Sequence, residues 1–145
     1  MRTLFIVVVT FLLAACTMMY ARTYVVEPIE TLSPEQKQAV FHAFREFLVN
    51  KGLKPLQYGD TTDKNRVAFQ ISGSRAGFAF RRDWEDVLEL SYARDVFEMR
   101  LVRIVHHPDD FTEKYLAEFV EKTEKFIQEA TSRAVKLRLI SKKPI

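Results

Sequence analysis

The sequence contains a single cysteine among its 145 residues, together with only four glycines and five prolines. One cysteine cannot form an internal disulfide, and it cannot supply the set of thiolates that Cys-based zinc sites use. The low glycine and proline content, with 48% apolar and 28% charged residues, excludes collagen-like, low-complexity and disordered chains. The length suits one domain better than two. The composition therefore predicts a single ordinary folded domain.

Catalytic signatures are also missing. No serine lies in a G-x-S-x-G motif, and the segment Gly73–Gly77 lacks the Lys-Ser/Thr end of a phosphate-binding loop, so a hairpin turn explains it better. Asp83, Glu85 and Asp86 could pair for general acid–base chemistry. Their arginine neighbours favour surface ion pairs in a turn instead. We therefore expect no catalytic residues and no enzymatic activity.

Histidine is scarce, and the three that are present do not form a ligand set. His106 and His107 are adjacent, and adjacent residues leaving a strand point to opposite faces, so both cannot easily bind one ion. Asp109 and Asp110, which follow, are better explained as acids that favour a helix N-terminus. His42 lies opposite the apolar face of a predicted helix, where we expect it to contact solvent. The sequence thus predicts no metal and no cofactor.

The N-terminal segment differs from the rest of the chain. No charge occurs between Arg2 and Arg22, and the strongly apolar part is confined to residues 4–15. A transmembrane helix needs about 20 apolar residues, whereas the h-region of a signal peptide is about this short. The run ends in Leu13-Ala14-Ala15-Cys16, which resembles the lipobox of bacterial lipoproteins: a branched apolar residue, two small residues and the cysteine that is lipidated. A transmembrane anchor and a soluble secreted protein are the alternatives.

The resemblance covers only about the first sixteen residues. It implies cleavage between Ala15 and Cys16, a diacylglyceryl thioether on the cysteine, and a fatty acid such as palmitate on the new amino group. In Gram-negative lipoproteins an aspartate after the cysteine often retains the protein in the inner membrane, and Thr17 is not that signal. The resemblance therefore implies the periplasmic face of the outer membrane, with the inner membrane as the alternative. Acyl chains anchor firmly, because each buried CH₂ contributes about 0.8 kcal/mol.

These features divide the chain into a signal peptide (residues 1–15), a lipidated cysteine with a tether (residues 16–32) and one globular domain (residues 33–145). The signal peptide holds one arginine and no acid, so its removal lowers the net charge from +3 to +2. Such a small charge does not recruit nucleic acid. We therefore expect no nucleic-acid partner, although residues around 24–26 of the tether could form a short strand.

Two amphipathic helices are predicted, one near each end of the domain. Ser33-Pro34-Glu35-Gln36 has the pattern of a capping box with proline at the first helical position, and Gly52 suits the residue after the helix end. The second helix follows Pro108, with Asp110 and Glu113 at capping-box spacing, and we expect it to continue to about Ala134. Residues 135–139 alternate like a strand, so an extended or frayed tail is the alternative there.

Between the helices, apolar residues alternate as they do in strands that are buried on one face. The predicted strands comprise residues 67–71, 78–81, 88–92 and 97–102, with a short edge strand possible at 53–58. The sequence therefore predicts an α+β fold, in which an antiparallel four-stranded sheet is covered on one face by the N-terminal and the C-terminal helix. A fifth strand is the alternative if the tail is extended.

The expected function is that of a non-enzymatic binding or assembly module, held at the membrane by Cys16 and binding another cell-envelope protein. The segment 133–143 interleaves bases with apolar residues, which suits an acidic, partly apolar partner or an anionic membrane surface. The candidate contact residues are Arg133, Lys136, Arg138, Lys142 and Lys143. We expect this segment to be dispensable for folding. The alternative function is periplasmic binding of a lipid or cell-wall ligand in a groove between sheet and helices.

Overall fold

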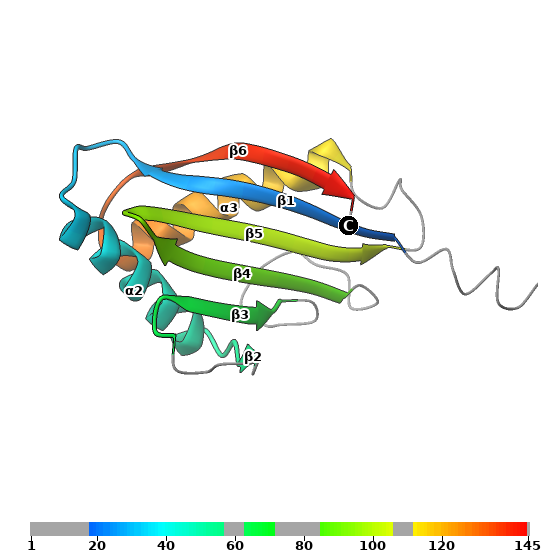
Figure 1. The fold of residues 1–145 in the computed structure, drawn as a ribbon, viewed down its shortest axis with the longest axis horizontal. Helices are drawn as coiled ribbons and strands as arrows, with labels where there is room; N and C mark the ends of the chain where they lie inside the picture. The colour runs from blue at the N-terminus through cyan, green and yellow to red at the C-terminus, as the bar shows by residue number, and fades with distance from the viewer. Residues whose placement is uncertain (1–17, 57–62, 72–84, 106–111, 145) are drawn as a thin grey trace, which may run out of the picture.

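The computed structural model describes residues 18–56, 63–71, 85–105 and 112–144. Its elements in chain order are β1 (Met18–Pro28), α2 (Pro34–Asn50), β2 (Pro55–Leu56), β3 (Arg66–Gln70), β4 (Glu85–Ala93), β5 (Val96–Val105), α3 (Glu113–Thr131) and β6 (Val135–Pro144). The strands form one six-stranded sheet in the order β2-β3-β4-β5-β1-β6, and each neighbouring pair is antiparallel (Figure 1). The expected α+β class is confirmed, but the sheet has more strands than expected.

One additional strand comes from the segment predicted to be a tether. β1 covers Met18–Pro28 and lies between β5 and β6. Its pattern is weak locally, because Arg22 interrupts the alternation of Tyr20, Tyr24 and Val26 on the inner face. The partners that make it a strand lie far along the chain, so no local signal could reveal the pairing.

The other additional strand comes from the end of the chain, where we expected helix α3 to continue to about Ala134. The helix ends at Thr131, because Ser132 adopts a left-handed conformation with φ 55° and donates its N–H to the carbonyl of Gln128 at 2.8 Å. Glycine or asparagine usually occupies such a position, so a serine there is only a weak signal of a helix end. β6 then pairs with β1 over most of its length.

The hairpin predicted over residues 72–77 and the strand predicted at 78–81 lie outside the described residues. Among the described strands, β3 pairs directly with β4, with Val67 opposite Leu90 and Phe69 opposite Leu88. Of the edge strand expected at 53–58, Pro55–Leu56 form β2, which pairs with β3, and residues 57 and 58 lie outside the described residues.

The start of α2 is formed as predicted. The Ser33 N–H donates to Oε1 of Gln36 at 2.9 Å, and the Gln36 N–H donates to Oγ of Ser33 at 3.3 Å, which completes the capping box. Gly52 has φ 88°, a backbone conformation that is strained for any residue with a side chain. The helix ends just before it, at Asn50.

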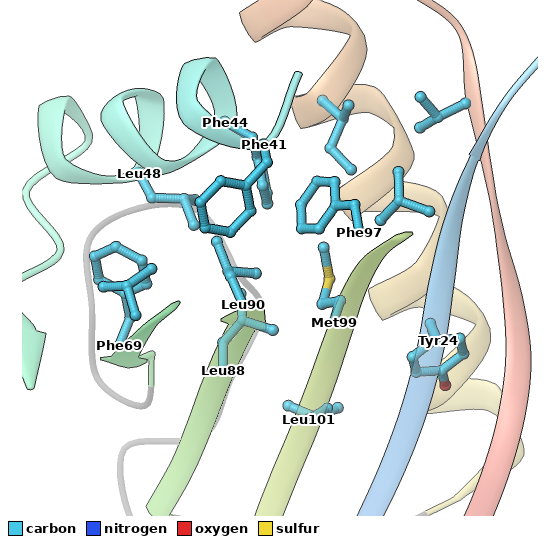
Figure 2. Packing of buried hydrophobic residues seen from close by; sticks show 14 of the residues in the cluster. Tyr24, Phe41, Phe44, Leu48, Phe69, Leu88, Leu90, Phe97, Met99 and Leu101 are labelled. Carbon is cyan, nitrogen blue, oxygen red and sulfur yellow. The ribbon is translucent and has the colours of Figure 1, made fainter. Parts of the chain in front are cut away.

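Helices α2 and α3 both contribute to one hydrophobic core with the inner face of the sheet (Figure 2). Phe41 of α2 meets Phe97 of β5 edge-to-face, with ring centroids 5.3 Å apart. On α3, Phe119 lies 6.1 Å from the ring of Tyr24 in β1. The largest fully buried apolar side chains come from both layers: Phe41, Phe44, Leu48, Phe69, Ile71, Leu88, Leu90, Met99, Leu101 and Ile127. Neither helix of the described part is long and apolar enough to cross a membrane.

Candidate binding surface

Strand β6 contains four of the five basic residues that the sequence singled out, and it is the edge strand beside β1. Arg133 lies just before it. The four bases whose side chains are described each form an ion pair: Arg133 with Glu30 at 3.1 Å, Lys136 with Glu124 at 3.1 Å, Arg138 with Glu27 at 2.6 Å and Lys142 with Glu113 at 3.9 Å. Glu124 is only 17% exposed, but the other three carboxylates are exposed. Exposed ion pairs contribute at most about 1 kcal/mol, so a partner's carboxylate could replace Glu30, Glu27 or Glu113.

The apolar residues of β6 divide into a buried and an exposed set. Val135 is only 4% exposed and Leu137 packs against the core. Leu139 and Ile140 are 37% and 44% exposed. Val135 and Leu137, although they lie within the predicted contact segment, pack in or against the core. The apolar part of the candidate surface therefore consists of Leu139 and Ile140.

A β-bulge explains why two adjacent apolar residues are both exposed. Tyr24 of β1 lies opposite Leu139, and Thr23 lies opposite Ser141, so Ile140 is the extra residue between them. A bulge leaves one residue out of the ladder and increases the local twist of the strand. The exposed apolar pair therefore lies where the edge of the sheet is irregular.

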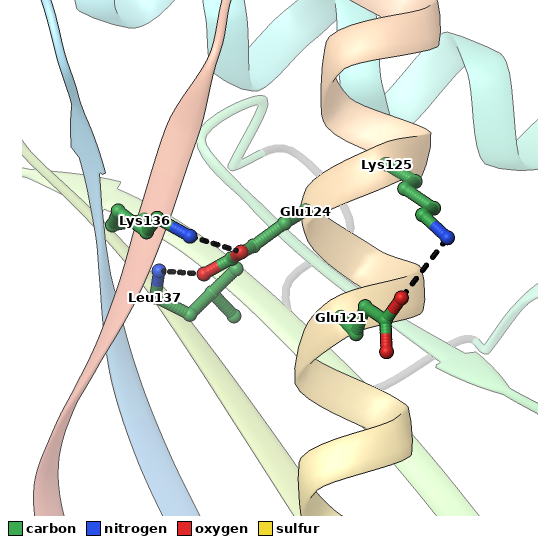
Figure 3. A network of polar contacts seen from close by, with 5 residues as sticks. All are labelled: Glu121, Glu124, Lys125, Lys136 and Leu137. Atoms are coloured by element: carbon green, nitrogen blue, oxygen red, sulfur yellow. Dashed lines mark hydrogen bonds and ion pairs between the residues drawn. The ribbon is translucent and has the colours of Figure 1, made fainter.

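Helix α3 covers the first half of the edge. The backbone N–H of Leu137 donates to Oε1 of Glu124 at 2.9 Å, and Nζ of Lys136 lies 3.1 Å from Oε2 of the same carboxylate (Figure 3). One turn earlier, Glu121 pairs with Lys125 at 3.0 Å on the exposed side of the helix. The hydrogen bond from Leu137 to Glu124 ties α3 to the backbone of β6. Further along β6, the described contact with α3 is the ion pair of Lys142 with Glu113 at 3.9 Å, which joins side chains and leaves the backbone of the strand edge free of a described partner.

A buried ion pair lies on the inner face of the sheet. Asp86 of β4 and Arg103 of β5 are both 0% exposed and opposite each other in register, with Nε–Oδ1 and Nη2–Oδ2 distances of 2.6 Å. Tyr115, in the first turns of α3, donates to Oδ2 at 3.4 Å, and its ring lies 3.9 Å from the guanidinium carbon. Burial, followed by the nearby Asp86 carboxylate, raises the pKa of Tyr115. The cluster joins the start of α3 to β4 and β5.

The burial of Asp86 corrects the interpretation of this residue as part of a surface ion pair in a turn. A signal was available in the sequence, because Asp86 continues the even-numbered inner face of Leu88 and Leu90. Arg103 likewise follows Leu101 at a spacing of two. Since neither side chain reaches the surface, the pair offers no group to a ligand from solution.

Comparison of the chain with known protein families, with curated proteins and with solved structures finds no match. Within the described residues, no group of three or more His, Cys, Asp or Glu side chains could hold a metal ion.

Several residues weighed from the sequence lie outside the described part of the chain. They are the lipobox Leu13 to Cys16, the segment Gly73–Gly77, Asp83, His106, His107, Asp109 and Asp110. His42 is described and is half-buried rather than fully in solvent, with its ring edge-on to Phe41 at a centroid distance of 5.2 Å.

A groove of about 700 Å³ opens where β1 ends and α2 begins. Core residues such as Val26, Val40 and Phe97 contribute to its lining, and Ile29, which is 66% exposed, also contributes. The charged residues of the lining are Glu27, Glu30, Lys37, Asp95, Glu98 and Arg138. The groove lies at one end of the sheet, next to Arg138 of β6, and its lining combines charged and apolar residues.

Proposed function

We propose that this protein is a small lipoprotein, anchored by Cys16 at the periplasmic face of the outer membrane, that acts as a non-enzymatic binding or assembly module for another envelope protein. The observation that supports this proposal most is the open half of the β6 edge. In the part of the chain that the structure describes, β6 has no neighbouring strand on its outer side beyond the hydrogen bond to Glu124, and this half of the edge also carries the exposed pair Leu139 and Ile140.

Strand addition is the binding mode that suits such an edge. An extended peptide that lies along a sheet edge gains main-chain hydrogen bonds, and its alternate side chains contact the residues beside the edge. Arg138 and Lys142 flank the apolar pair and are held by exposed carboxylates, Glu27 and Glu113. A partner segment with apolar and acidic side chains could replace those carboxylates. The partner is therefore proposed to be an extended, acidic and partly apolar segment of another protein.

The groove favours a second candidate function, the binding of a small periplasmic ligand. Its volume of about 700 Å³ falls within the range of known ligand sites. The lining has four acids, Glu27, Glu30, Asp95 and Glu98, against two bases, which disfavours an anionic lipid headgroup and favours a cationic or neutral ligand. This candidate ranks second, because the groove is open and lined by both charged and apolar residues, whereas the edge of β6 suits strand addition.

Site-specific crosslinking in intact cells tests the first proposal. A photoreactive residue at Ile140 should give a defined crosslinked product, whereas the same residue at Val49, an exposed apolar position on α2, should not. The paired substitutions Arg138→Glu and Lys142→Glu should reduce the Ile140 product several-fold. If products at Ile140 and Val49 are the same, or if the charge reversal has no effect, the proposed contact is wrong.

A further inference from the structure

The connection between the proposed lipid anchor and the sheet is very short. A single residue, Thr17, separates Cys16 from Met18, where β1 begins. Consecutive Cα atoms are 3.8 Å apart, so the Cα atoms of Cys16 and Met18 can be separated by at most about 7.6 Å. A lipid on Cys16 would therefore be attached almost directly to the first residue of a strand.

The position of Met18 identifies one end of the sheet, which we call the anchor end. Met18 lies opposite Val105, the last residue of β5, and Tyr20 lies opposite Pro144, the last residue of β6. β4 begins at the same end, because it runs antiparallel to β5. The start of α3 is also there, since Glu113 pairs with Lys142 and Tyr115 contacts Asp86.

Among the described residues, the anchor end carries a small excess of positive charge. Besides the buried pair Asp86 and Arg103, which cancels, its charged residues at strand ends and in the first turn of α3 are the bases Lys114, Lys142 and Lys143 and the acids Glu85 and Glu113. Arg22 also lies near this end, but it is half-buried on the inner face of the sheet. Lys142 has 57% of its side chain exposed. Exposed lysines near a bilayer are attracted to anionic headgroups.

From the short connection and this charge we infer that the anchor end docks directly on the phospholipid headgroups, an inference that rests on the proposed lipidation of Cys16. The opposite end, with the groove and the β4–β5 turn at Arg94 and Asp95, then points away from the membrane. β1 contains 11 residues, and a strand rises about 3.3 Å per residue, so the two ends are about 33 Å apart.

This orientation restricts the partner in the proposed function. Leu139 lies opposite Tyr24, six residues beyond Met18, which corresponds to about 20 Å along the strand. The open part of the β6 edge, from Leu139 to Pro144, lies between that height and the headgroups. A segment that pairs with it is therefore held within about 20 Å of the headgroups, which suits a partner in the same membrane as this protein.

Fluorescence quenching by lipids tests the orientation on the full, lipidated protein. The variants Lys142→Cys and Asp95→Cys place a bimane label at the anchor end and at the opposite end, and both positions are exposed. Vesicles of phosphatidylethanolamine and phosphatidylglycerol, with a nitroxide on some headgroups, provide the quencher. We expect several-fold stronger quenching at position 142 than at position 95. Equal quenching, or stronger quenching at 95, would overturn the inference.

Two controls separate this inference from the proposed lipidation. Flotation of the same vesicles reports anchoring alone, so a protein that does not float shows that the lipoprotein proposal itself is wrong. Insertion of ten Gly and Ser residues between Thr17 and Met18 gives a flexible tether and should leave flotation intact while quenching at Lys142→Cys falls toward that at Asp95→Cys. Quenching that is unchanged by the insertion would contradict the argument from chain length.

Discussion

Substitution of Asp86 should destabilise the fold, because it removes one partner of the buried ion pair. Replacement by Asn keeps the volume but leaves the Arg103 guanidinium buried without its carboxylate. Loss of one partner of a buried pair costs about 3–5 kcal/mol. We expect Asp86→Asn to lower the free energy of unfolding by this amount, measured by urea denaturation of a chain that begins at Thr17.

The same two strands provide the control for this prediction. Glu89 and Arg100 also lie opposite each other on β4 and β5, but on the outer face and partly exposed, with an Nη1–Oε2 distance of 3.3 Å. Glu89→Gln should cost at most about 1 kcal/mol, because water solvates the remaining arginine. If Asp86→Asn and Glu89→Gln lower the free energy of unfolding by similar amounts, the buried pair does not stabilise the fold more than the exposed pair.

Tyr24 should make the stability sensitive to alkaline pH. Burial, opposed in part by Arg22, raises its pKa from 10.0 to about 12. Between these values the unfolded chain releases the tyrosine proton while the folded chain retains it, so the free energy of unfolding falls as pH rises. The stabilisation from Tyr24 is complete below pH 10 and is lost as the pH rises to 12. The pKa values of Tyr92 and Tyr115 are raised as well, so these residues act in the same direction.

Circular dichroism, followed together with tyrosinate absorbance, measures this alkaline transition. Tyr24→Phe removes one titrating group and should make the loss of stability above pH 10 less steep. A transition of unchanged steepness in this variant would show that Tyr24 does not contribute to it.

At the scale of elements, β6 should be essential for folding. Truncation after Ser132 removes Val135 and Leu137 from the core and takes away one of the two neighbours of β1. This reverses the expectation from the sequence that the segment is dispensable. We expect the truncated chain to lose its cooperative thermal transition, monitored by circular dichroism.

Two single substitutions within β6, one at a buried and one at an exposed position, serve as controls for the truncation. Val135→Ala, at a buried position, should cost about 2 kcal/mol, since each buried CH₂ contributes about 0.8 kcal/mol and a cavity is left. Ile140→Ser, at the exposed bulge, should change stability by less than about 0.5 kcal/mol. A truncated chain that unfolds as cooperatively as the full domain would show that β6 is not part of the core.

The elements differ in how well the sequence alone could predict them. The capped start of α2 and the alternation of β4 and β5 are local patterns, and the structure agrees with them. β1 and β6 pair with each other from opposite ends of the chain, so their stabilisation comes from contacts that no sequence window contains. The exposed surface at Leu139 and Ile140 depends on a bulge between these strands and could not be located before their register was known.

At the scale of the whole molecule, anchoring is the property that decides the proposed function. Cys16→Ser removes the only thiol that could be lipidated. The variant should accumulate as an uncleaved precursor and incorporate no radiolabelled fatty acid, measured by gel mobility and autoradiography. Cleavage and labelling like those of the unmodified chain would contradict the resemblance to lipoproteins.

The placement of β1 also determines how the molecule would respond to a pulling force. Between Tyr20 and Val25, β1 has antiparallel neighbours on both sides, β5 and β6. Their hydrogen bonds run across the strand, whereas tension transmitted through a lipid on Cys16 would act along it. The bonds on both sides are then loaded together in shear rather than broken one after another. If Cys16 is lipidated and β6 binds a partner as proposed, such a strand would transmit mechanical load between the two while the domain stays folded.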